Sequence, residues 1–119
     1  MFKIEAIVRP ERISHVSNAL EKIGCGGFHY QNVTGQGKQQ GVEIATGRGG
    51  STINRSAVPK TLLTTVVTQD MKEKAIDAII TASRSSDNGE IGDGKIFITQ
   101  LTQVFRAVSY THLTLPTKA

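Results

Sequence analysis

The fold is decided first by residues 2–23, which read FKIEAIVRPERISHVSNALEKI. At the start of this stretch, Phe2, Ile4, Ala6 and Val8 alternate with the charged residues Lys3, Glu5 and Arg9, which is the two-residue period of a half-buried strand. Pro10 suits the first turn of a helix, apolar residues follow at three- and four-residue spacing, and Gly24 is placed to end that helix. This stretch therefore predicts a strand followed by a helix over about residues 11–23.

The remaining elements follow from the same reasoning. Residues 28–33 are aromatic and β-branched, and residues 61–68 form a second β-rich run, so both predict strands. Asp70 is suited to start a helix, and residues 96–99 predict a fourth strand. One face of the second helix carries Ala75, Ile76, Ile79 and Ile80.

The order β-α-β, long loop, β-α-β matches the ferredoxin-like, split βαβ arrangement. We therefore predict an α+β sandwich in which a four-stranded antiparallel sheet carries two helices on one face. The opposite face of the sheet needs a cover, and a chain of 119 residues buries only about two-thirds of its unfolded surface. Both points favour an oligomer whose subunits pack sheet against sheet.

The segment from residue 42 to residue 57 has little regular periodicity and is rich in glycine, serine and threonine. A loop of this length inside a small domain is usually functional or disordered. We expect it to be mobile in the free protein and to become ordered only with a ligand or a partner, because it offers almost no apolar surface for burial. The flanking region from Gly35 to Lys60 carries four basic residues against Glu43 alone, which suits phosphates or an acidic partner.

Composition narrows the class of protein and its compartment. Cys25 is the only cysteine, so one chain can form neither an intrachain disulfide nor a thiolate metal cluster, which favours a reducing compartment. No run of about 18 apolar residues exists, and the N-terminus does not resemble a secretion signal. We expect a cytoplasmic protein.

A phosphate-binding turn is predicted at Gly92-Asp93-Gly94-Lys95, because bare backbone N–H groups and an ammonium both suit a phosphate. The motif is not a P-loop, since Ile96 stands where the magnesium-binding Ser or Thr would be and a strand follows in place of a helix. A run of this length can also be a simple glycine turn into a strand. Taken singly, it carries little weight.

A second glycine-rich run, Gly35-x-Gly37-x-x-x-Gly41, misses the dinucleotide fingerprint by its spacing and precedes no helix. His15, His29 and His112 show no metal-binding spacing, and no Ser, Cys or carboxylate comes with a sequence pattern for activation. The sequence therefore predicts a protein that is not an enzyme.

Taken together, the two glycine motifs are more specific. Residues 34–41 read TGQGKQQG, residues 88–97 read NGEIGDGKIF, and residues 3–10 read KIEAIVRP. These runs resemble the P-II family of nitrogen-regulatory signal proteins, which carry K-G-x-G-R-Q-x-G before a flexible loop and T-G-x-x-G-D-G-K-I-F before the last core strand. The resemblance extends from about residue 2 to residue 106.

The resemblance implies a cytoplasmic homotrimer that binds ATP or ADP in the clefts between subunits and regulates a target, such as a membrane transporter or a metabolic enzyme, through its long loop. It also implies that Gln39 helps to bind magnesium and 2-oxoglutarate and that Lys60 pairs with a carboxylate of 2-oxoglutarate. The nucleotide-binding residues that it implies are Gly35, Gly37, Lys38, Gln39, Gly92, Asp93, Gly94, Lys95 and Arg106.

The chain departs from the family pattern in its loop and at its end. Residues 45–51 read ATGRGGS and contain no tyrosine, so tyrosine modification of the loop is excluded. Val108 stands where the family has a second arginine, which implies a reduced nucleotide affinity. Residues 109–119 do not resemble the family tail and look like translated vector sequence, so we expect the domain to be residues 1–108.

Three alternatives stay open at this stage. The first is a divergent P-II-like sensor whose loop responds to another ligand, such as a metal ion or bicarbonate. The second is a small phosphate-handling enzyme of the same fold, which the position of Pro10 directly after Arg9 disfavours because no phosphate cradle fits there. The third is an RNA-binding domain, which is disfavoured because residues 61–68 contain no aromatic side chain on which a base could stack. We expect no nucleic-acid partner.

Overall fold

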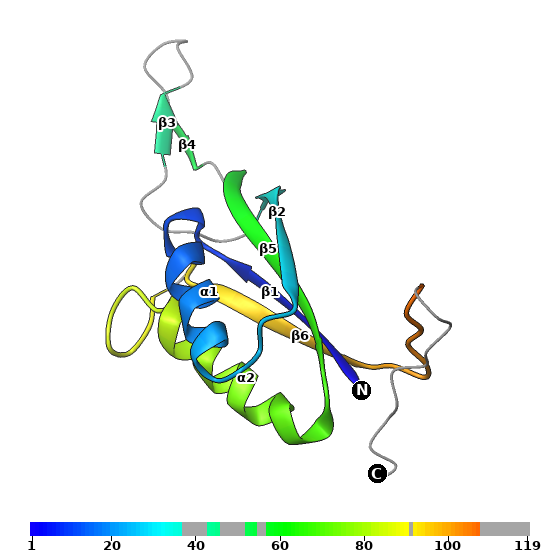
Figure 1. The fold of residues 1–119 in the computed structure, drawn as a ribbon. Coiled ribbons are helices and arrows are strands. Elements are labelled where there is room, and N and C mark those ends of the chain that lie inside the picture. The colour runs from blue at the N-terminus through cyan, green and yellow to red at the C-terminus, as the bar shows by residue number, and fades with distance from the viewer. Residues whose placement is uncertain (37–42, 46–51, 55–56, 91, 108–119) are drawn as a thin grey trace.

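The structure is a computed structural model, and it describes residues 1–36, 43–45, 52–54, 57–90 and 92–107. The chain begins with strand β1 and helix α1, which are connected by the short 3-10 helix η1 (Figure 1). In chain order the elements are β1 (Phe2–Val8), η1 (Pro10–Arg12), α1 (Ile13–Lys22), β2 (Phe28–Gly35), β3 (Glu43–Ala45), β4 (Thr52–Asn54), β5 (Val58–Val67), α2 (Gln69–Ser83) and β6 (Gly94–Gln100).

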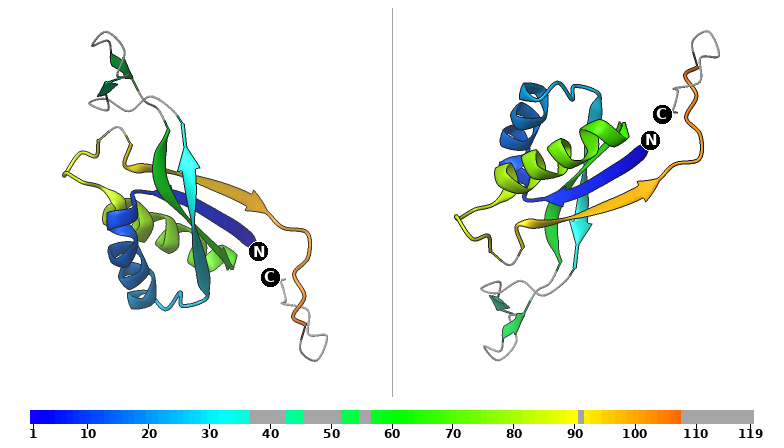
Figure 2. Two further views of the ribbon diagram at one scale, coloured as in Figure 1. Left: turned by 90° about the horizontal axis from the view of Figure 1, so that it is seen from above. Right: turned by 90° about the horizontal axis from the view of Figure 1, so that it is seen from below.

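The main sheet has four strands in the order β2-β5-β1-β6, and all neighbouring strands are antiparallel. Both helices cover one face of this sheet (Figure 2). The predicted α+β, ferredoxin-like arrangement of four antiparallel strands and two helices is thus confirmed. In the split βαβ fold, the first and third strands along the chain lie at the centre of the sheet. Here these central strands are β1 and β5.

Strict alternation of burial along the two central strands builds the core. Ile4, Ala6 and Val8 of β1 are buried beneath the helices, and so are alternate residues of β5 from Thr61 to Val67. The helices contribute the buried residues Val16, Leu20, Ala75 and Ile79. Each fully buried Leu, Ile or Val of this kind contributes roughly 1.5–3 kcal/mol relative to an exposed position.

The element boundaries differ from the predicted ones in ways that follow from pairing. β5 begins at Val58 rather than at residue 61, because Val58 pairs with Gly35 at the end of a longer β2. Likewise β6 extends over Gly94–Gln100, since all of it pairs with β1. Gly24 ends the first helix as predicted, with φ of 88° and its N–H donating to Glu21 at 3.0 Å.

The segment predicted to be an irregular loop contains two short strands. β3 and β4 pair with each other in a separate two-stranded antiparallel sheet, with Ile44 opposite Ile53 (Figure 1). Each strand places one β-branched isoleucine between small or polar residues, a pattern too short to show a period. The rest of residues 42–57, on which we predicted mobility, and the predicted non-native tail at residues 109–119 lie outside the described residues apart from residue 57.

The face of the main sheet away from the helices has no cover among the described residues (Figure 2). The register places Ile7, Leu62 and Phe97 on that face, where Ile7 and Leu62 are half-buried and Phe97 is 48% exposed. The chain alone therefore leaves apolar side chains in contact with water on one side of its sheet.

A test of the close packing at the sheet end is the pair Gly94→Ala and Gly26→Ala. Gly94 has φ of 144°, and a Cβ there would overlap the carbonyl oxygen of Ile7, so we expect the alanine variant to lose about 2 kcal/mol or more of unfolding free energy. Gly26 faces open space, so its variant should change by less than about 1 kcal/mol. Urea unfolding measures both, and equal effects would contradict the contact.

Candidate functional site at the end of the sheet

The predicted phosphate-binding turn lies where β6 begins, beside the end of β1. Gly94 pairs with Val8 and Lys95 pairs with Ile7, so the turn is fixed to the sheet at its last two residues. Gly92 has φ of 97° and Gly94 has φ of 144°, backbone conformations that residues other than glycine rarely adopt. The two glycines are therefore needed by the path of the backbone itself.

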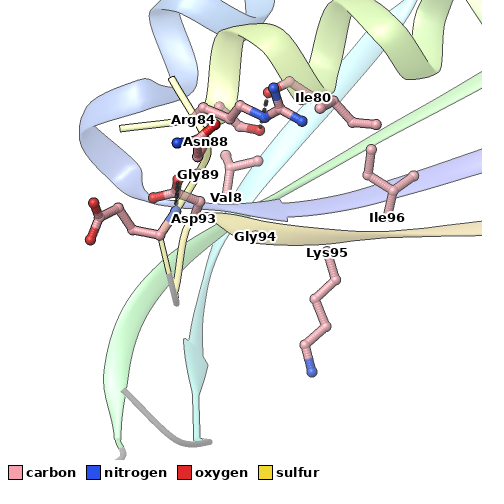
Figure 3. A pocket seen from close by; sticks show the side chains of 11 residues that line it. Val8, Ile80, Arg84, Asn88, Gly89, Asp93, Gly94, Lys95 and Ile96 are labelled. Carbon is pink, nitrogen blue, oxygen red and sulfur yellow. Dashed lines mark hydrogen bonds between the residues drawn. The ribbon is translucent and has the colours of Figure 1, made fainter. Parts of the chain in front are cut away.

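The Asp93 carboxylate holds this turn together. Its Oδ1 accepts hydrogen bonds from Arg9 Nε at 2.9 Å and from the Ser85 hydroxyl at 2.7 Å. Its Oδ2 accepts from the backbone N–H groups of Ser85 at 2.9 Å and Glu90 at 2.7 Å. The side chain is buried and aims into the turn (Figure 3). One carboxylate thus connects the end of β1, the loop after α2 and the turn before β6.

The charge of Asp93 is stabilised by these donors. Burial by itself would raise the pKa of Asp93, but the backbone and side-chain hydrogen bonds from Ser85, the backbone hydrogen bond from Glu90 and the Arg9 contact outweigh it and hold that pKa well below its usual range. The group is therefore ionised at neutral pH.

Lys60 brings the two glycine motifs together. It lies on β5 and its Nζ donates a hydrogen bond of 2.5 Å to the carbonyl oxygen of Gly92. Its Cγ lies 3.4 Å from the position that a Cβ would take at Gly35, so the Lys60 side chain lies beside the end of β2. One side chain consequently lies beside Gly35 of the first motif and is hydrogen-bonded to Gly92 of the second.

The Lys60 ammonium is in an unusual environment. Burial is the largest influence and lowers the pKa of Lys60 below its ordinary value, and the charge of Arg9 lowers it further, while Glu11 and Asp93 act in the opposite direction. Among the described residues no carboxylate lies within ion-pair distance of Lys60. This end of the sheet therefore has a buried cation that an added anion would stabilise.

Lys95 points away from the helices. Its side chain is exposed and lies on the uncovered face of the sheet with Ile7 (Figure 3). The ammonium makes no hydrogen bond or ion pair with any residue that the structure describes. Lys95 is thus in a position to contact a ligand at the turn from the open face.

A cavity of about 550 Å³ lies on the other side of the turn, beneath the end of α2. Val8, Ile80 and Ile96 line it (Figure 3), and so do Arg84 and Glu90 of the segment between α2 and β6. Sequence reasoning missed this cavity. Asp93, Gly94 and Lys95 of the turn also line it, although the Lys95 side chain points away toward the open face (Figure 3).

Arg106 is not assembled with the turn in one chain. Arg106 is exposed and follows the end of β6 that pairs with Phe2, which is the opposite end of the sheet from Gly94. Gly37, Lys38 and Gln39 lie outside the described residues. Within the part of the chain that the structure describes, no group of three His, Cys, Asp or Glu residues is placed to hold a metal ion.

The fold and the site together define a class: a small ferredoxin-like α+β protein whose sheet ends in a glycine-rich turn carrying an exposed lysine. The chain belongs to the family "Nitrogen regulatory protein P-II", whose model matches residues 1–109. The family resemblance of the three sequence motifs is thereby confirmed. Members of this family are regulatory signal proteins of nitrogen metabolism, not enzymes, and they act on target proteins as oligomers.

Two relatives and one solved structure illustrate the similarity. Nitrogen regulatory protein P-II 2 of Methanothermobacter thermautotrophicus is 38% identical over 106 residues, which is 89% of this chain and 88% of the relative. The P-II protein of Pyropia yezoensis is 41% identical over 107 residues, 89% of this chain and 90% of the relative. The crystal structure of Arabidopsis thaliana PII bound to citrate has a TM-score of 0.71 and 37% identity, covering 93% of this chain and 83% of that one.

No helix among the described residues is long and apolar enough to cross a membrane.

The stability contribution of Asp93 should depend on pH in a defined direction. Because folding lowers its pKa, the contribution is fully present above the pKa of the unfolded chain, near 4, and is lost as the pH falls through the lower folded-state value. We expect Asp93→Asn to reduce the unfolding free energy by about 1.5–3 kcal/mol at pH 7 and pH 5. The difference in unfolding free energy between the wild type and Asp93→Asn should become smaller at pH 3. Urea unfolding at the three pH values measures it, and an equal difference at pH 7 and pH 3 would contradict the assignment.

Proposed function

We propose that this chain is a non-enzymatic signal protein that binds ATP or ADP between the subunits of a homotrimer, together with magnesium and 2-oxoglutarate. It then regulates a partner, such as a membrane transporter or a metabolic enzyme, through residues 42–57. The observation that carries the proposal is that Lys60 lies beside Gly35 and donates to Gly92 at the end of the sheet where Lys95 is exposed. The two glycine motifs therefore meet at one side chain.

The chemistry of this end of the sheet suits a polyphosphate. Gly92 and Gly94 carry no side chain that would keep a phosphate from the backbone, and the Lys95 ammonium contributes a point charge on the open face. The Asp93 carboxylate within the turn is directed inward, where Arg9 and the hydrogen bonds from Ser85 and Glu90 stabilise its charge, so it does not face a bound anion. These properties support nucleotide binding at residues 92–95, together with Gly35 at the end of β2 and with Gly37, Lys38 and Gln39, which follow it in sequence.

Lys60 supports the proposed 2-oxoglutarate site. A buried ammonium without a carboxylate partner among the described residues is costly, and a carboxylate ligand would offset that cost. The related Arabidopsis thaliana PII binds citrate in its crystal structure, and citrate is also a polycarboxylate. Magnesium would be held with Gln39, as the family resemblance implies.

More than one chain is needed to complete the proposed site. Arg106 and residues 92–95 lie at opposite ends of β6, so they can contact one nucleotide only if they come from different chains. The uncovered apolar face with Ile7, Leu62 and Phe97 offers a surface on which such chains can pack.

The oligomeric state can be measured directly. We expect static light scattering at micromolar concentration to give a mass about three times the 12.8 kDa of one chain, because assembly buries the open sheet face. A mass of one chain under these conditions would contradict the shared site.

Nucleotide binding is tested with Lys95→Ala. We expect calorimetric titration with ATP and magnesium to show affinity lowered about 10- to 150-fold, which corresponds to about 1.5–3 kcal/mol for a hydrogen bond to a charged group. Lys74→Ala, an exposed lysine on α2, is the matched control and should bind like the wild type. Unchanged affinity in Lys95→Ala would show that residues 92–95 form only a structural turn.

Parallel titrations with 2-oxoglutarate and with bicarbonate separate the proposed ligand from the divergent-sensor alternative.

A further inference from the structure

Four hydrogen-bond donors from three separate parts of the chain converge on one carboxylate. We use the name Asp93 clamp for Asp93 together with Arg9, Ser85 and Glu90, whose donors it accepts. Arg9 follows β1, Ser85 lies two residues after the end of α2, and Glu90 precedes the turn. The clamp therefore fixes three segments relative to one another at a single point.

Only an ionised carboxylate satisfies all four donors. Oδ1 accepts from Arg9 Nε and the Ser85 hydroxyl, while Oδ2 accepts from two backbone N–H groups. An asparagine amide has the same shape but one accepting oxygen, so either orientation would place its NH₂ group against at least one N–H that can only donate. Replacement of Asp93 by Asn should therefore open the clamp without changing the size of the side chain.

The clamp acts on the residues that the proposed nucleotide would touch. Asp93 lies between Gly92, whose carbonyl oxygen accepts from Lys60, and Gly94, which packs against the Ile7 carbonyl. Lys95 comes next along the chain and already pairs within the sheet. Both glycines have positive φ and are intrinsically free to take other conformations, so the turn needs restraint from outside its own backbone. The clamp is the restraint on the side of the turn that faces the helices.

We infer that Asp93 is a positioning residue, which fixes the backbone of residues 92–95 for an anionic ligand and does not itself touch that ligand. The inference rests on the proposed nucleotide binding. Its physical basis is preorganisation: donors held in the bound arrangement bind more tightly because their ordering cost is met during folding. The inward direction of the carboxylate, which is 7% exposed, also keeps its negative charge away from phosphates.

The experiment compares Asp93→Asn, Ser85→Ala and Val67→Ala in the full chain. Val67 is buried at the far end of β5, opposite Phe2, so its variant loses stability without altering the turn. Each protein is titrated calorimetrically with Mg-ATP and with adenosine, and its urea unfolding is measured in parallel. The adenosine titration separates the effect on the phosphates from a general loss of folded protein.

We expect Asp93→Asn to bind Mg-ATP about tenfold more weakly or worse, and Ser85→Ala about threefold more weakly because it keeps the backbone donor. Both should bind adenosine nearly as the wild type does, and Val67→Ala should keep its affinity for both ligands within about twofold. If Asp93→Asn fails to fold, Ser85→Ala still carries the test.

Two results would overturn the inference alone. One is wild-type affinity for Mg-ATP in folded Asp93→Asn or, if that variant does not fold, in Ser85→Ala. The other is an equal loss for adenosine and Mg-ATP, which would indicate general destabilisation. Failure of the wild-type protein to bind Mg-ATP would instead overturn the proposed function, and the inference with it.

Discussion

The pairing of β1 on both of its edges is the constraint on which the rest of the molecule depends. All seven of its residues pair with β5 on one side and with β6 on the other. Its alternate side chains, Ile4, Ala6 and Val8, are buried beneath both helices. Where the strand ends, the Ile7 carbonyl packs against Gly94 and Arg9 reaches Asp93. The core and the candidate site are thus two consequences of one strand, so displacement of β1 would disturb both.

This arrangement explains how charge is distributed at the end of the sheet. The charge of Arg9 is compensated by its ion pair with Asp93. Lys60 instead donates a hydrogen bond to the carbonyl oxygen of Gly92, and the negative charges of Glu11 and Asp93 act on it without forming an ion pair. Lys95 is exposed on the open face. Positive charge is therefore in excess beside the glycine-rich turn, and the Asp93 carboxylate inside that turn stabilises its conformation. The proposed role of the site in binding phosphates and carboxylates follows from that imbalance.

The sequence predicted those parts of the structure that depend on periodic burial. The apolar residues of β1 and both helices repeat at fixed spacing, so the buried faces of these elements could be assigned before any contact was known. β5 was predicted from its β-rich composition, which indicates a strand without assigning its faces. The strands β3 and β4 were missed because three residues cannot show a period. The role of Asp93 was also missed, since Arg9 is 84 residues away in sequence and Ser85 is eight. Likewise, no local pattern indicates that Lys60 donates to Gly92.

The position of β6 has a consequence for communication between binding events. This strand begins at the turn and leads, at its other end, to Arg106. In the proposed homotrimer each chain would then contribute to two ligands, one at either end of the same strand. A paired strand is a stiff connection, because a shift at one end is passed along the β1 register to the other. Occupancy of one cleft would therefore alter the energy of the next, which is a coupling free energy between equivalent sites around a closed ring.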